Sequence, residues 1–147
     1  MVNIITPHLT VRNADAAIAF YKQAFGAEEK FRLPTPDGSA ILHATLKIGA
    51  STLFLNDEFP DMGSVAPVAG STGSPVTIHL QVDDADAWLK RAVDAGATVT
   101  MPLDNMFWGD RYGTLVDPFG HHWAIATQVE EVAPEELNRR AAAMFAS

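Results

Sequence analysis

The sequence predicts an α+β protein built from two βαβββ modules related by pseudo-twofold symmetry, and three observations support this fold class. Residues 6–16, TPHLTVRNADA, return at residues 77–87 as TIHLQVDDADA, with seven of eleven positions identical at an offset of 71. Each copy joins a β-rich run to a helix with a one-sided apolar stripe. Three further strand candidates then follow each helix. Such a sheet cannot cover both of its faces alone, so we expect the sheets to pair edge to edge as one cupped mixed sheet, with both helices outside.

The first module covers residues of about 3–56. Its opening run, IITPHLTV at residues 4–11, is rich in β-formers, and Pro7 favours a sheet edge or a bulge because proline has no N–H to donate. Asn13 is a good N-cap for the helix that follows, and Gly26 stands where a left-handed C-terminal cap is expected. Turn signals then separate three expected strands at residues 28–33, 40–48 and 51–56.

The second module, residues of about 76–128, repeats this plan. Its first strand is VTIHLQV at residues 76–82, Asp84 takes the N-cap position, and Gly96 takes the position of the C-terminal cap. Three strands are expected after the helix, at residues 97–102, 111–117 and 121–127. The repeated caps indicate that the duplication extends over the whole module.

Two segments lie outside the modules. Residues of about 57–75 are rich in Gly, Pro and Ser and indicate an exposed linker. Asp57, Glu58 and Asp61 at its start are expected to form a solvated turn; the alternative, a Ca²⁺ site, lacks the spacing of an EF-hand. Residues of about 134–146 have proline at the first helical position and two glutamates in the first turn, which predicts a C-terminal helix. We therefore expect a single domain over residues 1–147.

Composition excludes several kinds of function. The chain has no cysteine, so it has no disulfide, no thiolate metal ligand and no cysteine nucleophile. Its net charge is −8 at pH 7, and it lacks the clusters of Lys and Arg that bind phosphate backbones. No apolar stretch is long enough to cross a bilayer, and the start lacks a signal-peptide pattern. We therefore expect a cytoplasmic protein that binds neither nucleic acid nor membrane.

Three phrases carry a resemblance to a known family: PHLTVRNADAAIAFYKQAFGAEE, LFLNDEFPDMG and WGDRYGTLVDPFGHHWAIAT. Through them the chain resembles the vicinal-oxygen-chelate superfamily, which includes glyoxalase I, bleomycin-resistance proteins and extradiol dioxygenases, and more narrowly its PhnB-like branch. The resemblance spans residues of about 4–128. It implies a cupped sheet, commonly a homodimer, and in the family's enzymes a divalent metal held in the cup by His, Glu or Gln from the first and last strand of each module.

The ligand positions implied by this resemblance fall on residues that suit a metal poorly. They are Thr6, approximately Phe54, Thr77 and Ala124. Phe and Ala have no donor atom, and Thr is a poor ligand for a transition metal. We therefore expect that the usual metal site is lost and that the protein has no metal cofactor.

Three histidines offer an alternative site. Side chains two residues apart in a strand share a face, and His8, His79 and His122 each lie two residues from an implied ligand position. All three are expected to point into the cup, where they line a ligand pocket or, alternatively, form a displaced metal site. His43 is expected to be a packing or pocket residue, whereas His121 has the opposite parity and is expected to face away.

The segment NMFWGDRYG, at residues 105–113, has the densest grouping of aromatic and charged residues. The resemblance places it over the mouth of the cup. There Phe107, Trp108 and Tyr112 are candidates for stacking on a planar ligand, and Arg111 is a candidate for binding a carboxylate or phosphate. The alternative is structural, with Arg111 paired to the neighbouring aspartate and Trp108 covering the core or a dimer seam.

Three functions remain open. The one we favour is a small-molecule binder that holds a planar or oxygenated ligand in the cup by stacking and hydrogen bonds, as a homodimer. The alternative is a divalent-metal-dependent lyase, isomerase or dioxygenase that acts on a small oxygenated substrate through the three histidines. The third is a scaffold that docks through the stripe of Leu137, Ala141 and Met144 on the C-terminal helix.

Overall fold

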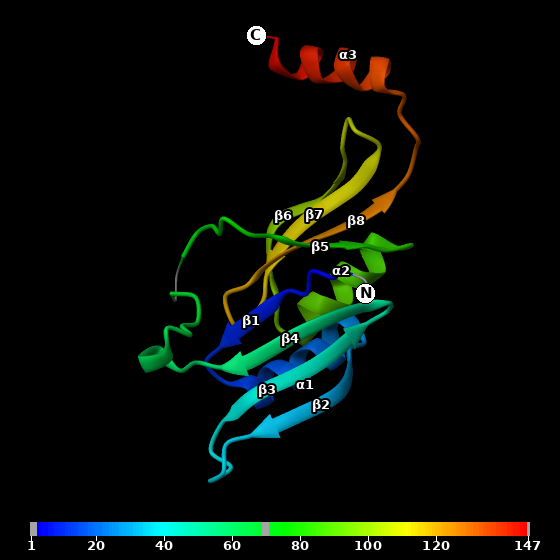
Figure 1. The fold of residues 1–147 in the computed structure, drawn as a ribbon. Coiled ribbons are helices and arrows are strands. Elements are labelled where there is room, and N and C mark those ends of the chain that lie inside the picture. Colours follow the sequence, from blue (N-terminus) through cyan, green and yellow to red (C-terminus); the bar gives the residue numbers. More distant parts are fainter. Residues whose placement is uncertain (1–2, 69–70, 147) are drawn as a thin grey trace.

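The structure, a computed structural model, describes residues 3–68 and 71–146 (Figure 1). The first unit contains β1 (His8–Val11), α1 (Ala14–Phe25), β2 (Glu28–Pro34), β3 (Ile41–Ile48), β4 (Ser51–Asp57) and the short 3-10 helix η1 (Pro60–Met62). The second contains β5 (Ile78–Gln81), α2 (Ala85–Ala95), β6 (Thr98–Asn105), β7 (Asp110–Val116), β8 (His122–Gln128) and then α3 (Pro134–Phe145). None of the helices in these two ranges is both long and apolar enough to span a bilayer.

Both units have the same sheet topology. The strand orders are β1-β4-β3-β2 and β5-β8-β7-β6, with the first pair of each sheet parallel and the others antiparallel. The register repeats too, because His8 lies opposite Phe54 and His79 lies opposite Ala124. The predicted α+β class, the duplicated module and the C-terminal helix are confirmed. The described strands form two four-stranded sheets that are not hydrogen-bonded to each other.

The first strand of each unit is shorter than predicted. β1 begins at His8 rather than at residue 4, because Pro7 cannot donate to the ladder, although its carbonyl accepts a hydrogen bond from Phe54 N at 2.9 Å. β5 likewise begins at Ile78, two residues later than predicted. Each first strand therefore contributes four residues, two to each face of its sheet.

The N-termini of α1 and α2 are capped by side chains in the same way. Asn13 accepts a hydrogen bond from Ala16 N at 3.1 Å, and Asp84 accepts one from Ala87 N at 3.1 Å. These bonds satisfy backbone donors that have no partner inside the helix. At its other end α1 stops at Gly26, whose φ of 67° is the left-handed conformation that glycine adopts without strain.

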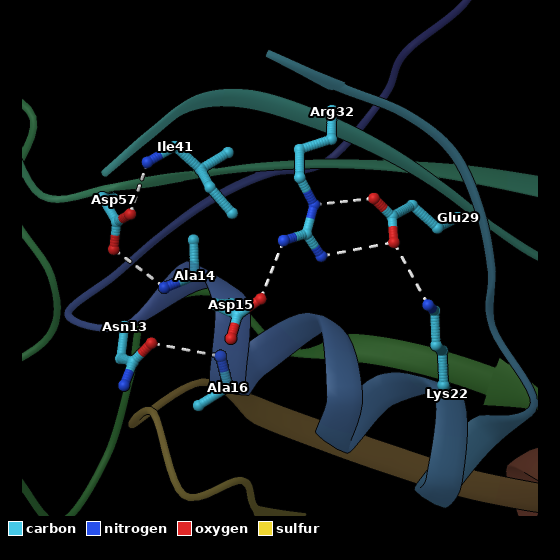
Figure 2. A network of polar contacts seen from close by, with 9 residues as sticks. All are labelled: Asn13, Ala14, Asp15, Ala16, Lys22, Glu29, Arg32, Ile41 and Asp57. Atoms are coloured by element: carbon cyan, nitrogen blue, oxygen red, sulfur yellow. Dashed lines mark hydrogen bonds and ion pairs between the residues drawn. The ribbon is translucent and has the colours of Figure 1, made fainter. Parts of the chain in front are cut away.

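A second cap joins each helix to the last strand of its own module. Asp57 accepts hydrogen bonds from Ala14 N at 2.8 Å and from Ile41 N at 2.7 Å (Figure 2). In the second module Thr127 occupies the equivalent place and accepts from Ala85 N at 2.7 Å. The expectation of a solvated turn is therefore wrong for Asp57, because its carboxylate holds a helix start and a strand start together.

An ion-pair network fixes α1 to β2 on the helix side of the first sheet. Figure 2 shows the Arg32 guanidinium between Glu29 and Asp15, each 2.7 Å away. Neighbouring strand residues point to opposite faces. Holding Arg32 on the helix side therefore turns Phe31 and Leu33 toward the other face.

α1 and α2 pack against each other, contrary to the expectation that both lie outside. α1 covers the first sheet, α2 covers the second, and aromatic rings fill the space where the modules meet. Phe25 stacks on Trp88 with ring centroids 6.4 Å apart, and it also lies 4.7 Å from the ring of Trp123 on β8. The reason is the width of the apolar stripe on α1, which buries Phe20 and Tyr21 as well as Phe25. The modules therefore meet through their helices.

A buried carboxylate lies at this junction. Asp117, 4% exposed, accepts hydrogen bonds at Oδ2 from the Tyr21 hydroxyl at 2.5 Å and from Trp123 Nε1 at 2.9 Å. At Oδ1 it accepts from the backbone N–H groups of Phe119 and His121 at 2.9 and 3.0 Å. Burial raises the pKa of Tyr21 well above its ordinary value, and the charge of Asp117 acts in the same direction. Four donors thus satisfy one buried carboxylate, and one of these donors, the Tyr21 hydroxyl, comes from the first module.

Two smaller contacts also cross the junction. Arg91 on α2 donates from Nε to Gln23 O at 2.6 Å, which satisfies a carbonyl at the C-terminal end of α1. The His121 ring, through Nε2, is hydrogen-bonded to Thr10 O on β1 at 2.8 Å. Together with the aromatic core, these bonds fix the orientation of each sheet relative to the other.

We predict that Tyr21→Phe lowers the free energy of unfolding by about 1–3 kcal/mol, because the Asp117 carboxylate then lacks one donor in a buried setting. The effect depends on pH. Above about pH 10 the unfolded chain releases the tyrosine proton while the folded chain keeps it, so stability falls as pH rises, by at most ~1.4 kcal/mol per pH unit. Urea denaturation between neutral and alkaline pH measures both effects.

Tyr112→Phe is the matched control, because Tyr112 is only half-buried. It should leave the free energy of unfolding at neutral pH close to that of the unchanged protein. The advantage of the unchanged protein over Tyr21→Phe should shrink above about pH 10. An advantage that stays constant through this range would contradict the role given to Tyr21.

Candidate functional site

Each sheet has one face covered by a helix and one face that α1 and α2 leave open. On the first sheet the open face carries one ring from every strand. These are His8, Phe31, His43 and Phe54, which we call face one. Their common side follows from the register, since Thr45 lies opposite both Phe31 and Phe54, and His8 lies opposite Phe54. The alternate residues of β1, Leu9 and Val11, are buried against the helix.

Face one is a compact group of rings. The His43 and Phe54 centroids are 4.8 Å apart, and His8 lies 5.8 Å from His43 and 5.9 Å from Phe54 in edge-on contacts. Phe31 approaches His43 at 6.4 Å and is 52% exposed. His43 Nε2 is hydrogen-bonded to Thr45 Oγ1 at 3.1 Å. The group offers both apolar ring surface and imidazole nitrogens.

The corresponding face of the second sheet carries His79, Tyr112 and the buried Ala124, and Trp108 on the loop before β7 contacts Tyr112; we call these four residues face two. His79 and Tyr112 are stacked with centroids 6.1 Å apart, and Trp108 meets Tyr112 edge-on at 5.5 Å. His79 Nε2 is hydrogen-bonded to Gln81 Oε1 at 2.8 Å. Trp108 is 37% exposed and donates from Nε1 to Asp110 at 3.2 Å. Face two therefore presents stacking surface beside polar groups.

The two faces are related copies with different contents. His8 and His79 hold the same place on their first strands, and His43 corresponds to Tyr112 in the phrases HATL and YGTL. Phe54 corresponds to Ala124, since each lies opposite its histidine in the parallel pair. Ala124 is only 1% exposed, so neighbouring groups cover this place on face two. No ring contact among the described residues joins one face to the other.

The three histidines predicted to share the cup are divided between two places. His8 belongs to face one and His79 to face two. His122, at the start of β8, lines a small cavity of about 140 Å³ together with His8 and His121. Residues 3–68 and 71–146 contain no group of three or more His, Cys, Asp or Glu side chains placed to hold a metal ion. The displaced metal site thus has no ligand set within this part of one chain.

Arg111 lies apart from the aromatic residues that precede and follow it. Its guanidinium makes two bonds to Asp86 on α2, at 2.8 and 3.0 Å, and the hydrogen bond from Arg111 lowers the pKa of the Asp86 carboxyl. The sequence suggested Asp110 as the structural partner, but Asp110 instead accepts from Trp108. Because Arg111 and Tyr112 are neighbours on β7, they point to opposite faces. Anion binding by Arg111 stays a prediction that this geometry does not favour.

Contacts that the sequence did not reveal hold the aromatic loop before β7. Phe107 meets Trp108 edge-on at 5.1 Å, and Arg140 on α3 donates to Phe107 O at 3.0 Å and to Glu130 at 2.6 Å. Gly109 lies so close to the chain after β8 that a Cβ there would be 2.4 Å from Glu130 O. Figure 1 shows α3 standing away from both sheets, so these bonds are its attachment to the second module.

Known proteins share this architecture. Residues 2–125 match the model of the Glyoxalase/Bleomycin resistance protein/Dioxygenase superfamily. An uncharacterized protein of Mycobacterium tuberculosis (strain H37Rv) is 48% identical over 135 residues, which cover 90% of this chain and 79% of that protein. The crystal structure of protein PA1353 from Pseudomonas aeruginosa is 28% identical with a TM-score of 0.68, over 86% of this chain and 98% of that one.

A more distant likeness concerns the fold alone. The fosfomycin resistance protein FosX of Listeria monocytogenes, crystallised with Mn(II) and sulfate, is 15% identical with a TM-score of 0.65, over 92% of this chain and 97% of that one. The match of the family model extends from the first strand through most of the last strand of the second sheet. The chain therefore belongs to the glyoxalase/bleomycin resistance protein/dioxygenase superfamily.

Proposed function

We propose that this protein binds a small planar or oxygenated molecule on its open sheet faces, by ring stacking and hydrogen bonds and without the metal of the family's enzymes. The observation that carries the proposal is the pair of partly exposed ring groups, each of which includes polar side-chain atoms. Ligand sites of proteins combine apolar and aromatic surface with a few polar groups in this way. We further propose that the protein is cytoplasmic, which its lack of cysteine fits, and that it belongs to the PhnB-like branch.

We also propose a homodimer in which face one of one copy lies opposite face two of its partner. Within one chain the helices meet at the junction of the modules, and the two faces are not in ring contact. A single chain therefore supplies one wall of each of two cups. A second copy, turned by a twofold axis, completes both cups with the same kind of contact.

The alternative is a divalent-metal-dependent lyase, isomerase or dioxygenase. Its support is the shared fold of FosX, which was crystallised with Mn(II). Thr6, Phe54, Thr77 and Ala124 at the implied ligand positions weigh against it, because Phe and Ala have no donor atom. Metal analysis of protein purified without a histidine tag, followed by calorimetric titration with Mn²⁺, Zn²⁺ and Ni²⁺, separates the two functions.

We predict that planar aromatic compounds protect the protein against thermal unfolding in buffer that contains EDTA. A ligand at about a hundred times its dissociation constant should raise the free energy of unfolding by ~2.7 kcal/mol. Trp108→Ala should weaken binding about tenfold, because an aromatic contact contributes roughly 0.5–1.5 kcal/mol beyond its burial. Thermal shift followed by titration calorimetry measures both.

Phe145→Ala on α3 is the control for the loss of an exposed aromatic ring, since Phe145 is 80% exposed and far from both faces in sequence. It should bind like the unchanged protein. Protection that appears only with added metal, or that Phe145→Ala weakens as much as Trp108→Ala, would contradict the proposal.

The dimer makes a prediction that two defective variants can test. One double variant, His43→Ala with Phe54→Ala, removes face one, and another, Trp108→Ala with Tyr112→Ala, removes face two. The homodimer formed by either double variant should lose ligand binding. In a mixed dimer one cup receives both defective faces and the other receives both intact faces, so binding should return at about half the original stoichiometry.

The mixed species is isolated through two different affinity tags and titrated by calorimetry. Mixtures of either double variant with itself are the controls and should stay inactive. Mixed dimers that bind nothing would show that each cup is built within one chain and would overturn the arrangement proposed here.

A further inference from the structure

We infer that the free edge of β5 binds an extended apolar peptide of a partner protein, which adds to the second sheet as a further strand. The inference goes beyond the proposed function, because it concerns a groove between the two modules rather than the rings of their open faces. Three observations carry it: an edge with unpaired backbone groups, two cavities that run along this edge, and a difference between the modules at one position.

β5 is an edge strand, since the second sheet has the order β5-β8-β7-β6. Val82 N donates to Ala126 O at 2.8 Å, so the backbone groups of Val82 point toward β8. Backbone groups of successive strand residues point to alternate sides, which directs the N–H and C=O groups of His79 and Gln81 away from β8. Neither backbone is hydrogen-bonded to another residue within 3–68 or 71–146. This edge therefore has donors and acceptors at the spacing that a further strand would meet.

The two modules differ at this edge. In β1 the residue that corresponds to Gln81 is Thr10, whose carbonyl is hydrogen-bonded to the His121 ring at 2.8 Å. In the first module Ala50 corresponds to His121, because each directly precedes the last strand of its module. Alanine has no side-chain donor to offer to the Gln81 carbonyl. An imidazole therefore closes the edge of β1, whereas the edge of β5 stays open.

Two cavities of about 410 and 550 Å³ adjoin each other along β5. Both are lined by residues 50–51 on the side of the first module and by residues 79–80 on β5. The cavity at the edge of β1, which His121 and His122 line, measures about 140 Å³. The small residues before and at the start of β4 thus leave a groove where the second module has two imidazole rings.

The walls of the 410 Å³ cavity indicate that its occupant is a single chain. Residues 4–7 and the start of β4 line this cavity together with β5, so it has protein on more than one side. The edge of another sheet, such as a second copy would bring, needs open space beside the strand that it pairs with. One extended peptide needs only the width of a strand, about 5 Å.

The side chains of the groove determine which peptide fits. Side chains of a strand alternate between two faces, so every second residue of the peptide would meet the apolar wall of the 410 Å³ cavity. Asp83 lines the other cavity and favours a lysine near one end of the peptide. Backbone pairing supplies the affinity of such a strand, and these contacts supply its selectivity. The apolar wall contains Ile48, Leu53, Ile78, Leu80 and Trp123.

The probe for this site is a capped peptide of alternating valine and threonine with a lysine at each end. It should bind the full chain and protect the backbone amides of His79 and Gln81 against hydrogen exchange, because these amides gain partners only when a strand is added. The same peptide with a methylated backbone keeps its side chains but loses its donors, so it should bind about tenfold more weakly. Exchange is followed residue by residue by NMR.

Ala50→His tests the difference between the modules. It places at the edge of β5 the ring that closes the edge of β1, so it should weaken peptide binding about tenfold, the equivalent of one hydrogen bond. Ala19→His on the exposed side of α1 is the matched control, because it adds the same ring away from the groove, and it should bind the peptide like the unchanged protein. Titration calorimetry gives the dissociation constants, and circular dichroism establishes that each variant is folded.

Equal peptide affinity in Ala50→His and the unchanged protein would overturn the inference. Amides of His79 and Gln81 that exchange as fast with the peptide as without it would do the same, and so would a peptide that does not bind. Self-association of the protein that Ala50→His abolishes would overturn it in favour of a second copy at this edge. These outcomes leave ligand binding on faces one and two untouched, since Trp108→Ala tests that function separately.

Discussion

The hydrogen bonds that converge on the carboxylate of Asp117 hold the two halves of this molecule in one arrangement. A buried charge is costly unless every lone pair that it exposes finds a donor, and here the donors come from both modules. The Tyr21 hydroxyl on α1 can reach Asp117 only while α1 lies beside the turn between β7 and β8. That contact keeps α1 and α2 packed against each other, and the position of the helices in turn decides which sheet faces stay open.

The duplication has preserved one set of features and changed another. Both modules keep the same topology, the same N-caps and a side chain that joins the last strand to the helix start, Asp57 in one module and Thr127 in the other. These features serve folding, and each module needs its own copy of them. The open faces differ, with His43 and Phe54 on one and Tyr112 and Ala124 on the other. In the proposed dimer, two walls of different chemistry would suit a ligand with two different sides better than a symmetric one.

The sequence predicted what is encoded locally and failed where a partner comes from far along the chain. The repeat predicted the two modules, and the N-caps Asn13 and Asp84 predicted where the helices start. Caps and apolar periods act within a few residues, so the sequence alone reveals them. The stripe on α1 showed that one side is buried but not against which element, so the helices were expected outside. The partner of Arg111, Asp86, lies 25 residues away, and nothing in the sequence pattern distinguishes it from Asp110.

The close approach at Gly109 has a consequence for the energetics of recognition. Any other residue would bring a Cβ to within 2.4 Å of Glu130 O and would also require a backbone with φ of +104°, so the loop that carries Phe107 and Trp108 is tied to the chain after β8. A loop that is already held in place in the free protein loses little conformational entropy when a ligand binds to it. In the proposed binding function, the ligand would therefore meet a preorganised aromatic surface.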